Sequence, residues 1–261
     1  MNGSVGTNHL GVNLAFTKFL FVSPAADDDA ARTRLRSAGG LVARGFFNDF
    51  EAEGRDAAPH ETIQFFVNDE GREQPGLTGA RYAIQVSSKY RPRLQDTEAE
   101  LRRRLTGSAV ITAIDGAVRV PQYTSAEMYA YAYKHASPRQ SGRLHRNVII
   151  FPMSKKAEWW AMSPLDRHSY FYPHTNGTGP VKGHARAAEA GISCICRRIF
   201  YNPDGTGRPN EFDFVNYFEC ADEQLPTFDA ICRALRDERQ NPEWRYVVEG
   251  PEWRGKRVLK W

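Results

Sequence analysis

A segment just past the middle of the chain places cations close to adjacent tryptophans. Lys155 and Lys156 come shortly before Trp159 and Trp160. A lysine at this spacing can bring a cation beside a large aromatic surface, which suits a flat, anionic aromatic ligand. The residue types alone favour a plainer interpretation, in which the tryptophans cover the core and the lysines lie in a solvated loop.

Three histidines and an arginine pair follow this segment. His168, His174 and His184 precede Arg197 and Arg198, which fall in a predicted strand. Because side chains alternate along a strand, one arginine can enter a pocket while the other faces solvent. Each histidine taken singly is more typical of a hydrogen-bonded structural residue than of a ligand.

The sequence contains no standard catalytic or metal-binding motif. It lacks a phosphate-cradling loop, a nucleophile elbow and an H-E-x-x-H site. The glycine-containing segments 176–179 and 204–207 do not link a strand to a helix, and we interpret both as turns. The four cysteines match no zinc pattern, and we expect Cys194 and Cys196 to be small core residues on one face of a strand.

Length and composition describe an ordinary globular chain. Its 261 residues are 41% hydrophobic, 25% charged and 12% aromatic, which excludes a disordered chain, a collagen and a disulfide scaffold. The net charge of +4 is spread along the sequence, so we expect no nucleic-acid partner. No apolar run is long enough for a membrane span and no secretory signal is recognisable, so we expect no membrane partner and a cytoplasmic location.

Hydrophobic periodicity is clearest in the second half of the chain. It predicts strands at 147–153, 192–201, 211–219 and 244–248, a helix that starts at Ser163-Pro164, and a helix along the apolar stripe of 225–235. The turn-rich segment 202–207 joins the second and third strands into a hairpin. The order β-α-β-β-α-β is the ferredoxin-like arrangement.

The first half shows the same order less clearly. It predicts strands at 15–22, 45–50, 82–87 and 109–114 and helices at 27–41 and 97–105, with 63–67 as an extra or competing strand. We therefore predict an α+β fold of two ferredoxin-like repeats that stack their sheets into a barrel-like core. The proposed divisions are an N-terminal half at 1–120, a connector at 121–145 and a C-terminal half at 146–261.

Four motifs in series give the second half a resemblance to a known family. FPMSKKAEWWAMSPLDR followed by a histidine, ICRRIFYNPDG, EFDFVNYFE and PEWRYVVEG look like the haem-binding half of the chlorite dismutase family, which includes the coproheme decarboxylases. The match covers about residues 146–250. The resemblance implies a dimeric-type α+β barrel that holds haem b in its C-terminal half, in a homo-oligomer that is a pentamer or a dimer.

The same resemblance implies roles for five residues. Arg197 would be the distal arginine above the haem and the catalytic residue. Lys155 would lie near the haem propionates, and Trp159 and Trp160 would pack beside the macrocycle. Glu243 would accept the second N–H of the proximal histidine, which fixes the tautomer and makes the ligand more electron-donating.

The proximal histidine has two candidates because this chain carries an insertion between the tryptophans and Arg197. Counting forward from the tryptophans gives His174, and counting back from Arg197 gives His184. Pro173 and Gly183 must interrupt what is one helix in relatives. We prefer His184 as the iron ligand, since a helix-compatible stretch follows it, and keep His174 as the alternative.

The residue before Pro-Met-Ser-Lys bears on the activity. Coproheme decarboxylases have a tyrosine there that forms the radical, whereas this chain has Phe151, which argues against that reaction. The resemblance then implies a haem-dependent oxidoreductase that transfers an oxygen atom from a small oxidant, chlorite or peroxide, to haem iron. The alternatives are a haem-dependent biosynthetic enzyme with an organic or nitrogen-containing substrate, a non-catalytic haem sensor or carrier, and a haem-free barrel.

Overall fold

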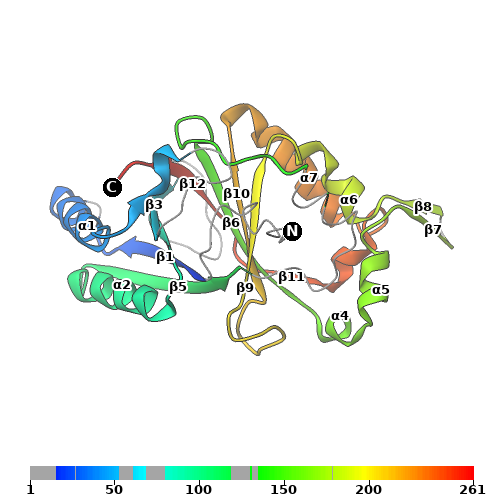
Figure 1. The fold of residues 1–261 in the computed structure, drawn as a ribbon, viewed down its shortest axis with the longest axis horizontal. Helices are drawn as coiled ribbons and strands as arrows, with labels where there is room; N and C mark the ends of the chain where they lie inside the picture. Colours follow the sequence, from blue (N-terminus) through cyan, green and yellow to red (C-terminus); the bar gives the residue numbers. More distant parts are fainter. Residues whose placement is uncertain are drawn as a thin grey trace, which may run out of the picture.

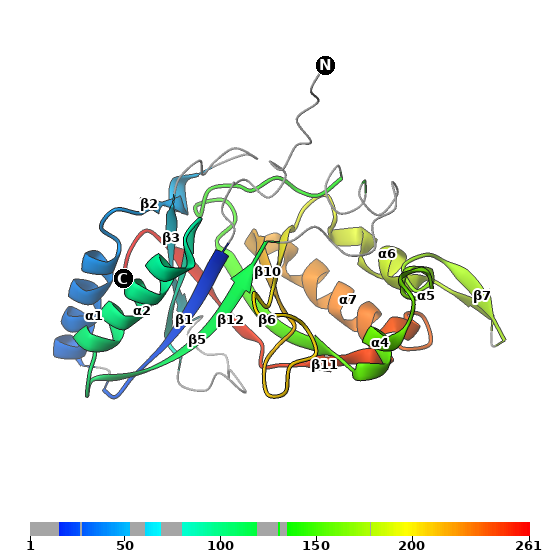
Figure 2. The same ribbon diagram turned by 60° about the horizontal axis from the view of Figure 1, so that its bottom comes forward.

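The structure is a computed structural model that describes residues 16–26, 28–52, 61–68, 80–118, 130, 135–177 and 179–261. The elements of the two halves of the chain lie side by side (Figure 1). Helices α1 and α2 lie at one end of the molecule and α6 and α7 at the other, with the strands between them (Figure 2).

The first half forms one four-stranded antiparallel unit with two helices. Its elements are β1 (Phe16–Pro24), α1 (Asp29–Val42), β2 (Phe47–Asn48), the 3-10 turn η2 (Asp49–Glu51), β3 (Thr62–Asn68), β4 (Tyr82–Ser88), α2 (Arg91–Arg104) and β5 (Ala109–Ala117). The four long strands pair in the order β5-β1-β4-β3. Numbered along the chain this is 4-1-3-2, in which the first and third strands are central.

The prediction for the second strand of this half was wrong. Segment 45–50 forms only the two-residue β2, because the Asn48 side chain accepts a hydrogen bond from Phe50 N at 3.0 Å and starts the 3-10 turn η2. The segment considered as a competing strand, 63–67, is the true second strand, β3. Helix α2 also begins earlier than predicted, at Arg91, with a proline in its first turn.

The second half repeats the unit with more helical insertions. Its elements are β6 (Asn147–Lys155), α4 (Ala157–Ala161), α5 (Pro164–Ser169), β7 (His174–Asn176), β8 (Gly179–Val181), α6 (Gly183–Ala188), η4 (Glu189–Gly191), β9 (Cys196–Tyr201), β10 (Phe214–Cys220), η5 (Asp222–Gln224), α7 (Leu225–Arg236), η6 (Pro242–Tyr246), β11 (Val247–Glu249) and β12 (Trp253–Val258). The long strands pair in the order β12-β6-β10-β9, again 4-1-3-2. The α+β class with two ferredoxin-like repeats is therefore confirmed.

Two strand predictions in this half need correction. The strand expected at 192–201 starts only at Cys196, because the backbone from Gly191 to Ile195 turns, with Ile195 N donating to Gly191 O at 2.8 Å. The strand expected at 244–248 is mostly the 3-10 helix η6, with only Val247 and Val248 inside the short β11. The fourth strand is instead β12, which the periodicity did not predict.

Strand β12 joins the two halves. It pairs with β3 of the first half on one side and with β6 of the second half on the other. At the opposite junction β5 and β9 share one pair, Ala117 with Tyr201. Since β10 also pairs with β6, the order of pairings closes on itself.

Aromatic side chains fill the space that the two sheets share. Phe19, Phe66, Tyr217 and Trp253 are each 0% exposed and belong to one cluster that draws on strands of both halves. Phe66 lies 6.2 Å from both Tyr217 and Trp253, measured between ring centroids. Contacts of this kind fix the two sheets against each other.

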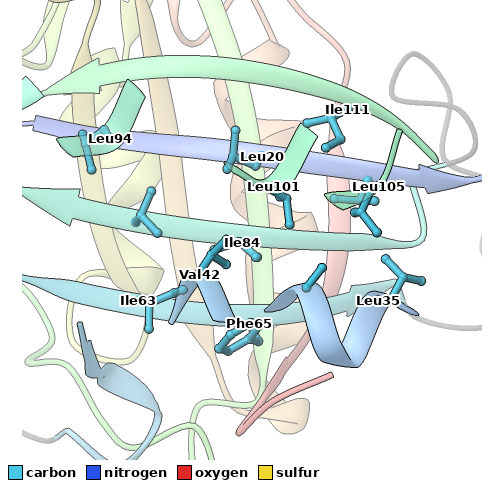
Figure 3. Close-up of a cluster of buried hydrophobic side chains, with 13 residues drawn as sticks. Leu20, Leu35, Val42, Ile63, Phe65, Ile84, Leu94, Leu101, Leu105 and Ile111 are labelled. Carbon is cyan, nitrogen blue, oxygen red and sulfur yellow. The ribbon is translucent and has the colours of Figure 1, made fainter. Parts of the chain in front are cut away.

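The outer face of each sheet is covered differently. Leu35 and Val42 of α1 and Leu94 and Leu101 of α2 pack against strand residues such as Ile84 in a continuous apolar layer (Figure 3). On the second sheet a smaller buried cluster lies under α7 and includes Ile149 and Phe228. The rest of that face borders a cavity.

About half of the predicted connector, 121–145, lies outside the described residues, so the three proposed divisions stay a prediction. Among the helices that the structure does describe, none is long and apolar enough to cross a lipid bilayer.

Candidate functional site

A largely apolar cavity lies between the second sheet and the helices beside it. One wall comes from β6, β9 and β10, and the other from α6, α7 and η6. The space free of protein atoms is about 1510 Å³, counting the part that is open to solvent. An apolar cleft that contains a few convergent polar groups is the usual form of a ligand site.

His184 enters this cavity from the start of α6. The preceding Gly183 has φ +66°, and a Cβ there would lie 2.5 Å from the carbonyl oxygen of Tyr172, so the tight entry needs glycine. His184 N donates to Tyr170 O at 3.1 Å, and the imidazole stacks on Phe171 with 6.0 Å between ring centroids. The side chain is 24% exposed. Backbone and ring contacts thus hold the imidazole in one orientation.

Glu243 joins His184 to Lys155. Its Oε2 lies 3.2 Å from His184 Nδ1 and its Oε1 lies 2.6 Å from Lys155 Nζ. Burial by itself would raise the pKa of Glu243, but the charges of Lys155 and His184 and their hydrogen bonds hold that pKa well below its usual range. The carboxylate therefore stays ionised and accepts hydrogen bonds from both sides.

Trp159 packs behind this array. Lys155 Nζ lies 4.2 Å from the centroid of the Trp159 ring, and Trp159 is 1% exposed. Its ring also lies 5.7 Å from the rings of both Tyr170 and Tyr246. The predicted juxtaposition of cation and tryptophan is present, although the lysine charge is directed to Glu243.

Asp213 positions Trp160 and the end of β6. Its Oδ2 accepts from Trp160 Nε1 at 3.0 Å and from Lys155 N at 2.7 Å, and its Oδ1 accepts from Gly207 N. Asp213 was not among the site residues predicted from the sequence. The available signal was its place among the inward positions of an alternating strand, with Val215 and Tyr217.

The two neighbouring arginines of β9 point to opposite faces of the sheet, as predicted, but Arg198 faces the inner side that the two sheets share and not solvent. Arg197 lines the cavity, whereas Arg198 pairs in register with Tyr217 of the shared core. Arg198 also acts electrostatically on Asp49, which lies on that inner side. Arg197 and His184 thus reach the same cavity from its two walls.

His174, the alternative candidate, lies outside the cavity. It is an exposed residue of β7, and its Nδ1 contacts Tyr172 O at 3.0 Å. Strands β7 and β8 form a small separate hairpin that extends away from the sheet (Figure 1). The cavity lining includes His184 and not His174. The predicted interruption of the helix by the insertion is confirmed, since α5 and α6 flank this hairpin.

Cys196 and Cys220 are buried free thiols, while Cys194 and Cys232 are partly buried beside the cluster of Ile149 and Phe228. The expectation of a small core residue is confirmed for Cys196, but Cys194 lies in the turn before β9 and does not share a strand face with it. Burial raises the pKa of Cys232 to about 11, which suppresses its thiolate at neutral pH. In the part of the chain that the structure describes, no group of three or more His, Cys, Asp and Glu side chains could hold a metal ion.

Comparison with known proteins points to one fold. No protein-family model matches the sequence. The chlorite dismutase from Candidatus Nitrospira defluvii, solved in complex with imidazole, is similar with a TM-score of 0.67 and 17% identity over 94% of this chain and 91% of that chain. A tryptophan-to-phenylalanine mutant of that enzyme in complex with cyanide gives a TM-score of 0.67 and 17% identity, over 94% and 90%. The chain has the chlorite dismutase fold, in agreement with the resemblance of its motifs.

Proposed function

We propose that this chain is a haem-dependent oxidoreductase of the chlorite dismutase family. The observation that carries the proposal is that His184 and Glu243, joined by an ion pair to Lys155 at the end of β6, line an apolar cavity that Arg197 enters from the sheet wall. This arrangement occurs in a chain with the chlorite dismutase fold.

The residues present fit a haem group. His184 has Nδ1 engaged by Glu243, which leaves Nε2 as the nitrogen that would bind haem iron. Trp160 and Trp244 are among the aromatic residues that line the cavity and would pack against a flat macrocycle. We propose that His184 rather than His174 would bind the iron, and that haem b is the form bound.

Glu243 and Lys155 act on the proton of His184. Accepting the Nδ1 hydrogen holds that proton on Nδ1 and increases the electron donation of Nε2. A neutral carboxylic acid would do this poorly, and burial favours the neutral acid. Lys155, with a side chain only 5% exposed, opposes that tendency and keeps Glu243 ionised. We propose this as its task beside any contact with haem propionates.

Arg197 supplies positive charge on the sheet wall. When bound, haem supplies an iron centre that can accept an oxygen atom from chlorite or a peroxide. The guanidinium would attract an anionic oxidant such as chlorite, and with either oxidant it would stabilise the negative charge that develops on the departing group. The apolar residues that line the cavity around Arg197 lower the local dielectric constant, which strengthens that interaction.

Phe151 narrows the choice of reaction. It is 3% exposed and lines the cavity, where it offers no phenolic proton. This supports oxygen-atom transfer over coproheme decarboxylation. A small oxidant is the substrate we propose first, an organic or nitrogen-containing substrate is the alternative, and a homo-oligomer in the cytoplasm remains the expected setting.

Haem binding and its ligand can be tested together. Protein purified with added haemin should show a Soret band that is lost in His184→Ala and kept in His174→Ala. Loss of the band in His174→Ala alone would reverse the assignment. A wild-type protein without the band would refute haem binding altogether.

Activity separates an enzyme from a haem sensor or carrier. An oxygen electrode with chlorite and a peroxidase assay should show turnover in the wild type that falls at least about 100-fold in Arg197→Ala. Equal rates in the two proteins would refute the role of Arg197, and no turnover by the haem-loaded wild type with either oxidant would favour the carrier.

A further inference from the structure

One polar side chain of the sheet wall has little to bind within the protein. Asn216 lies in β10, is 9% exposed and lines the cavity. Its cross-strand partners are Ile199 of β9 and Phe151 of β6. Phe218, two residues along the same strand, faces the same side. An amide at the centre of this wall is thus surrounded by apolar groups.

The hydrogen bonding of this amide is weak. Asn216 Nδ2 donates to the thioether Sδ of Met153 at 3.2 Å, which is the one hydrogen bond that this side chain makes to a described residue. A thioether sulfur is a weak acceptor, and a buried amide without good partners costs free energy. Such a group in a native protein requires an explanation, and a ligand that completes its hydrogen bonding is one.

Asn147 provides the contrast in the same sheet. It is 3% exposed in β6, and its Nδ2 donates to Cys220 O at 3.2 Å and to Asp222 Oδ1 at 2.9 Å. Its Oδ1 accepts from Lys256 Nζ at 2.6 Å. The sheet therefore satisfies a buried asparagine fully where the role is structural, and does not do so at Asn216.

The register places Asn216 close to Arg197. Arg197 is paired with Phe218, so on the cavity face Arg197 and Asn216 occupy diagonal positions of neighbouring strands. Diagonal Cβ atoms are roughly 7–8 Å apart, a separation that a long arginine side chain spans. One small ligand can contact both side chains.

We propose that Asn216 and Arg197 together form a two-donor subsite for a small oxyanion with at least two oxygen atoms. Arg197 supplies the charge, and the Asn216 amide leaves the Met153 sulfur to donate to a second oxygen of the anion. Asn216 is on this view a specificity-determining residue, and the inference rests on the proposed function. The substrate class it selects is the bent or branched oxyanion over a neutral ligand of similar size.

The apoprotein gives a test that needs no haem. Asn216→Leu should leave the thermal unfolding midpoint unchanged or raise it by a few degrees, because leucine suits the apolar wall. Asn147→Leu, the matched control, should lower the midpoint by at least about 4 °C, since it leaves polar partners unsatisfied. A fall in Asn216→Leu as large as that of Asn147→Leu would show a structural amide and overturn the inference.

Ligand titration of the haem-loaded protein gives the second test. The dissociation constant for nitrite, followed by the haem absorbance, should rise at least about 10-fold in Asn216→Leu. The constant for imidazole, a neutral ligand, should change less than about 3-fold. An unchanged nitrite constant in the loaded variant would refute the subsite while leaving the proposed function intact. A wild type that takes up no haem would instead refute the proposed function, and the inference with it.

Discussion

Two buried glutamates of this protein both have a lowered pKa but differ in their surroundings. Glu219 of β10 and Glu243 of η6 each accept hydrogen bonds from a cation, and in each the pKa is held well below its usual range against the opposing effect of burial. Glu219 is 0% exposed and Glu243 is 12% exposed. A shifted pKa alone would mark both as functional candidates.

The hydrogen-bond partners of Glu219 that the structure describes are all side chains inside the protein. Arg139 donates to Oε1 at 2.5 Å, Arg257 donates to Oε2 at 3.2 Å, and the Tyr217 hydroxyl donates to Oε1 at 2.6 Å. Arg139 also pairs with Asp49. These residues come from the connector, β10, β12 and η2, so the network ties distant segments together inside the molecule.

Glu243 differs because its partners line a cavity. His184 and Lys155 both border that space, whereas none of the described partners of Glu219 does so. A buried ion pair and a ligand site can therefore lower the pKa of a carboxylate in the same way. Glu243 is distinguished from Glu219 by the cavity and by the partly exposed imidazole beside its carboxylate.

The largest effect on stability is expected at Glu219. Glu219→Ala leaves two buried arginines without their carboxylate and should lower the free energy of unfolding by about 3–5 kcal/mol, measured by urea denaturation. Glu223→Ala removes an exposed glutamate of the neighbouring 3-10 turn and should change it by less than about 0.5 kcal/mol. Similar losses of unfolding free energy in the two variants would contradict the structural role assigned to Glu219.

Glu243→Gln should lower the free energy of unfolding less than Glu219→Ala does, but it should also weaken haem binding. The change leaves Lys155 without its counter-charge, and we expect a loss of about 1–3 kcal/mol. Haem affinity should fall about 10-fold or more, because the His184 orientation and basicity depend on the carboxylate. Transfer of haem to an acceptor protein measures this, and retention at the wild-type rate would contradict the assigned role.

Acid should weaken the protein through both glutamates. Their pKa values are lower in the folded chain, so the unfolded chain binds more protons once the pH falls below about 4.3. The stability that they contribute is complete above this pH and is lost progressively below it. Glu243→Gln should therefore show a shallower decline in the urea midpoint between pH 7 and 3.5 than the wild type, and parallel declines would argue against an ionised Glu243.

The smallest effect is expected at His174. His174→Ala alters an exposed residue of the hairpin and should change the free energy of unfolding by less than about 0.5 kcal/mol. Its Soret band and haem transfer rate should match those of the wild type. A marked change in the Soret band or in the haem transfer rate would show that the hairpin contributes to haem binding, and would contradict the contrast with His184.

Local patterns predicted those parts of the fold that depend on local interactions. The α7 stripe, with Phe228 buried against the sheet, follows from helical spacing. The β9–β10 hairpin follows from alternation and from the turn residues between the strands. Ser163 was placed correctly as the cap of α5, where its hydroxyl accepts from Asp166 N at 3.1 Å.

Strand β12 escaped prediction because its inward residues are unusual. Trp253, Gly255 and Arg257 face inward, and a buried arginine reads as a surface residue unless its carboxylate partner is known. That partner, Glu219, lies in another strand. The segment 244–248 was predicted as a strand because it contains aromatic and β-branched residues. It is instead mostly the 3-10 helix η6, which brings Glu243 to His184.

Local residue patterns were enough to predict the repeated ferredoxin-like order, the alternation that separates Arg197 from Arg198, and the resemblance to the chlorite dismutase family. Long-range contacts were needed to place His184 and not His174 at the cavity, to pair Lys155 with Glu243, and to leave Asn216 as a poorly satisfied amide. The physical reason is that periodicity records which face of one element is apolar. Burial, ion pairing and hydrogen-bond satisfaction depend on groups brought together from distant elements.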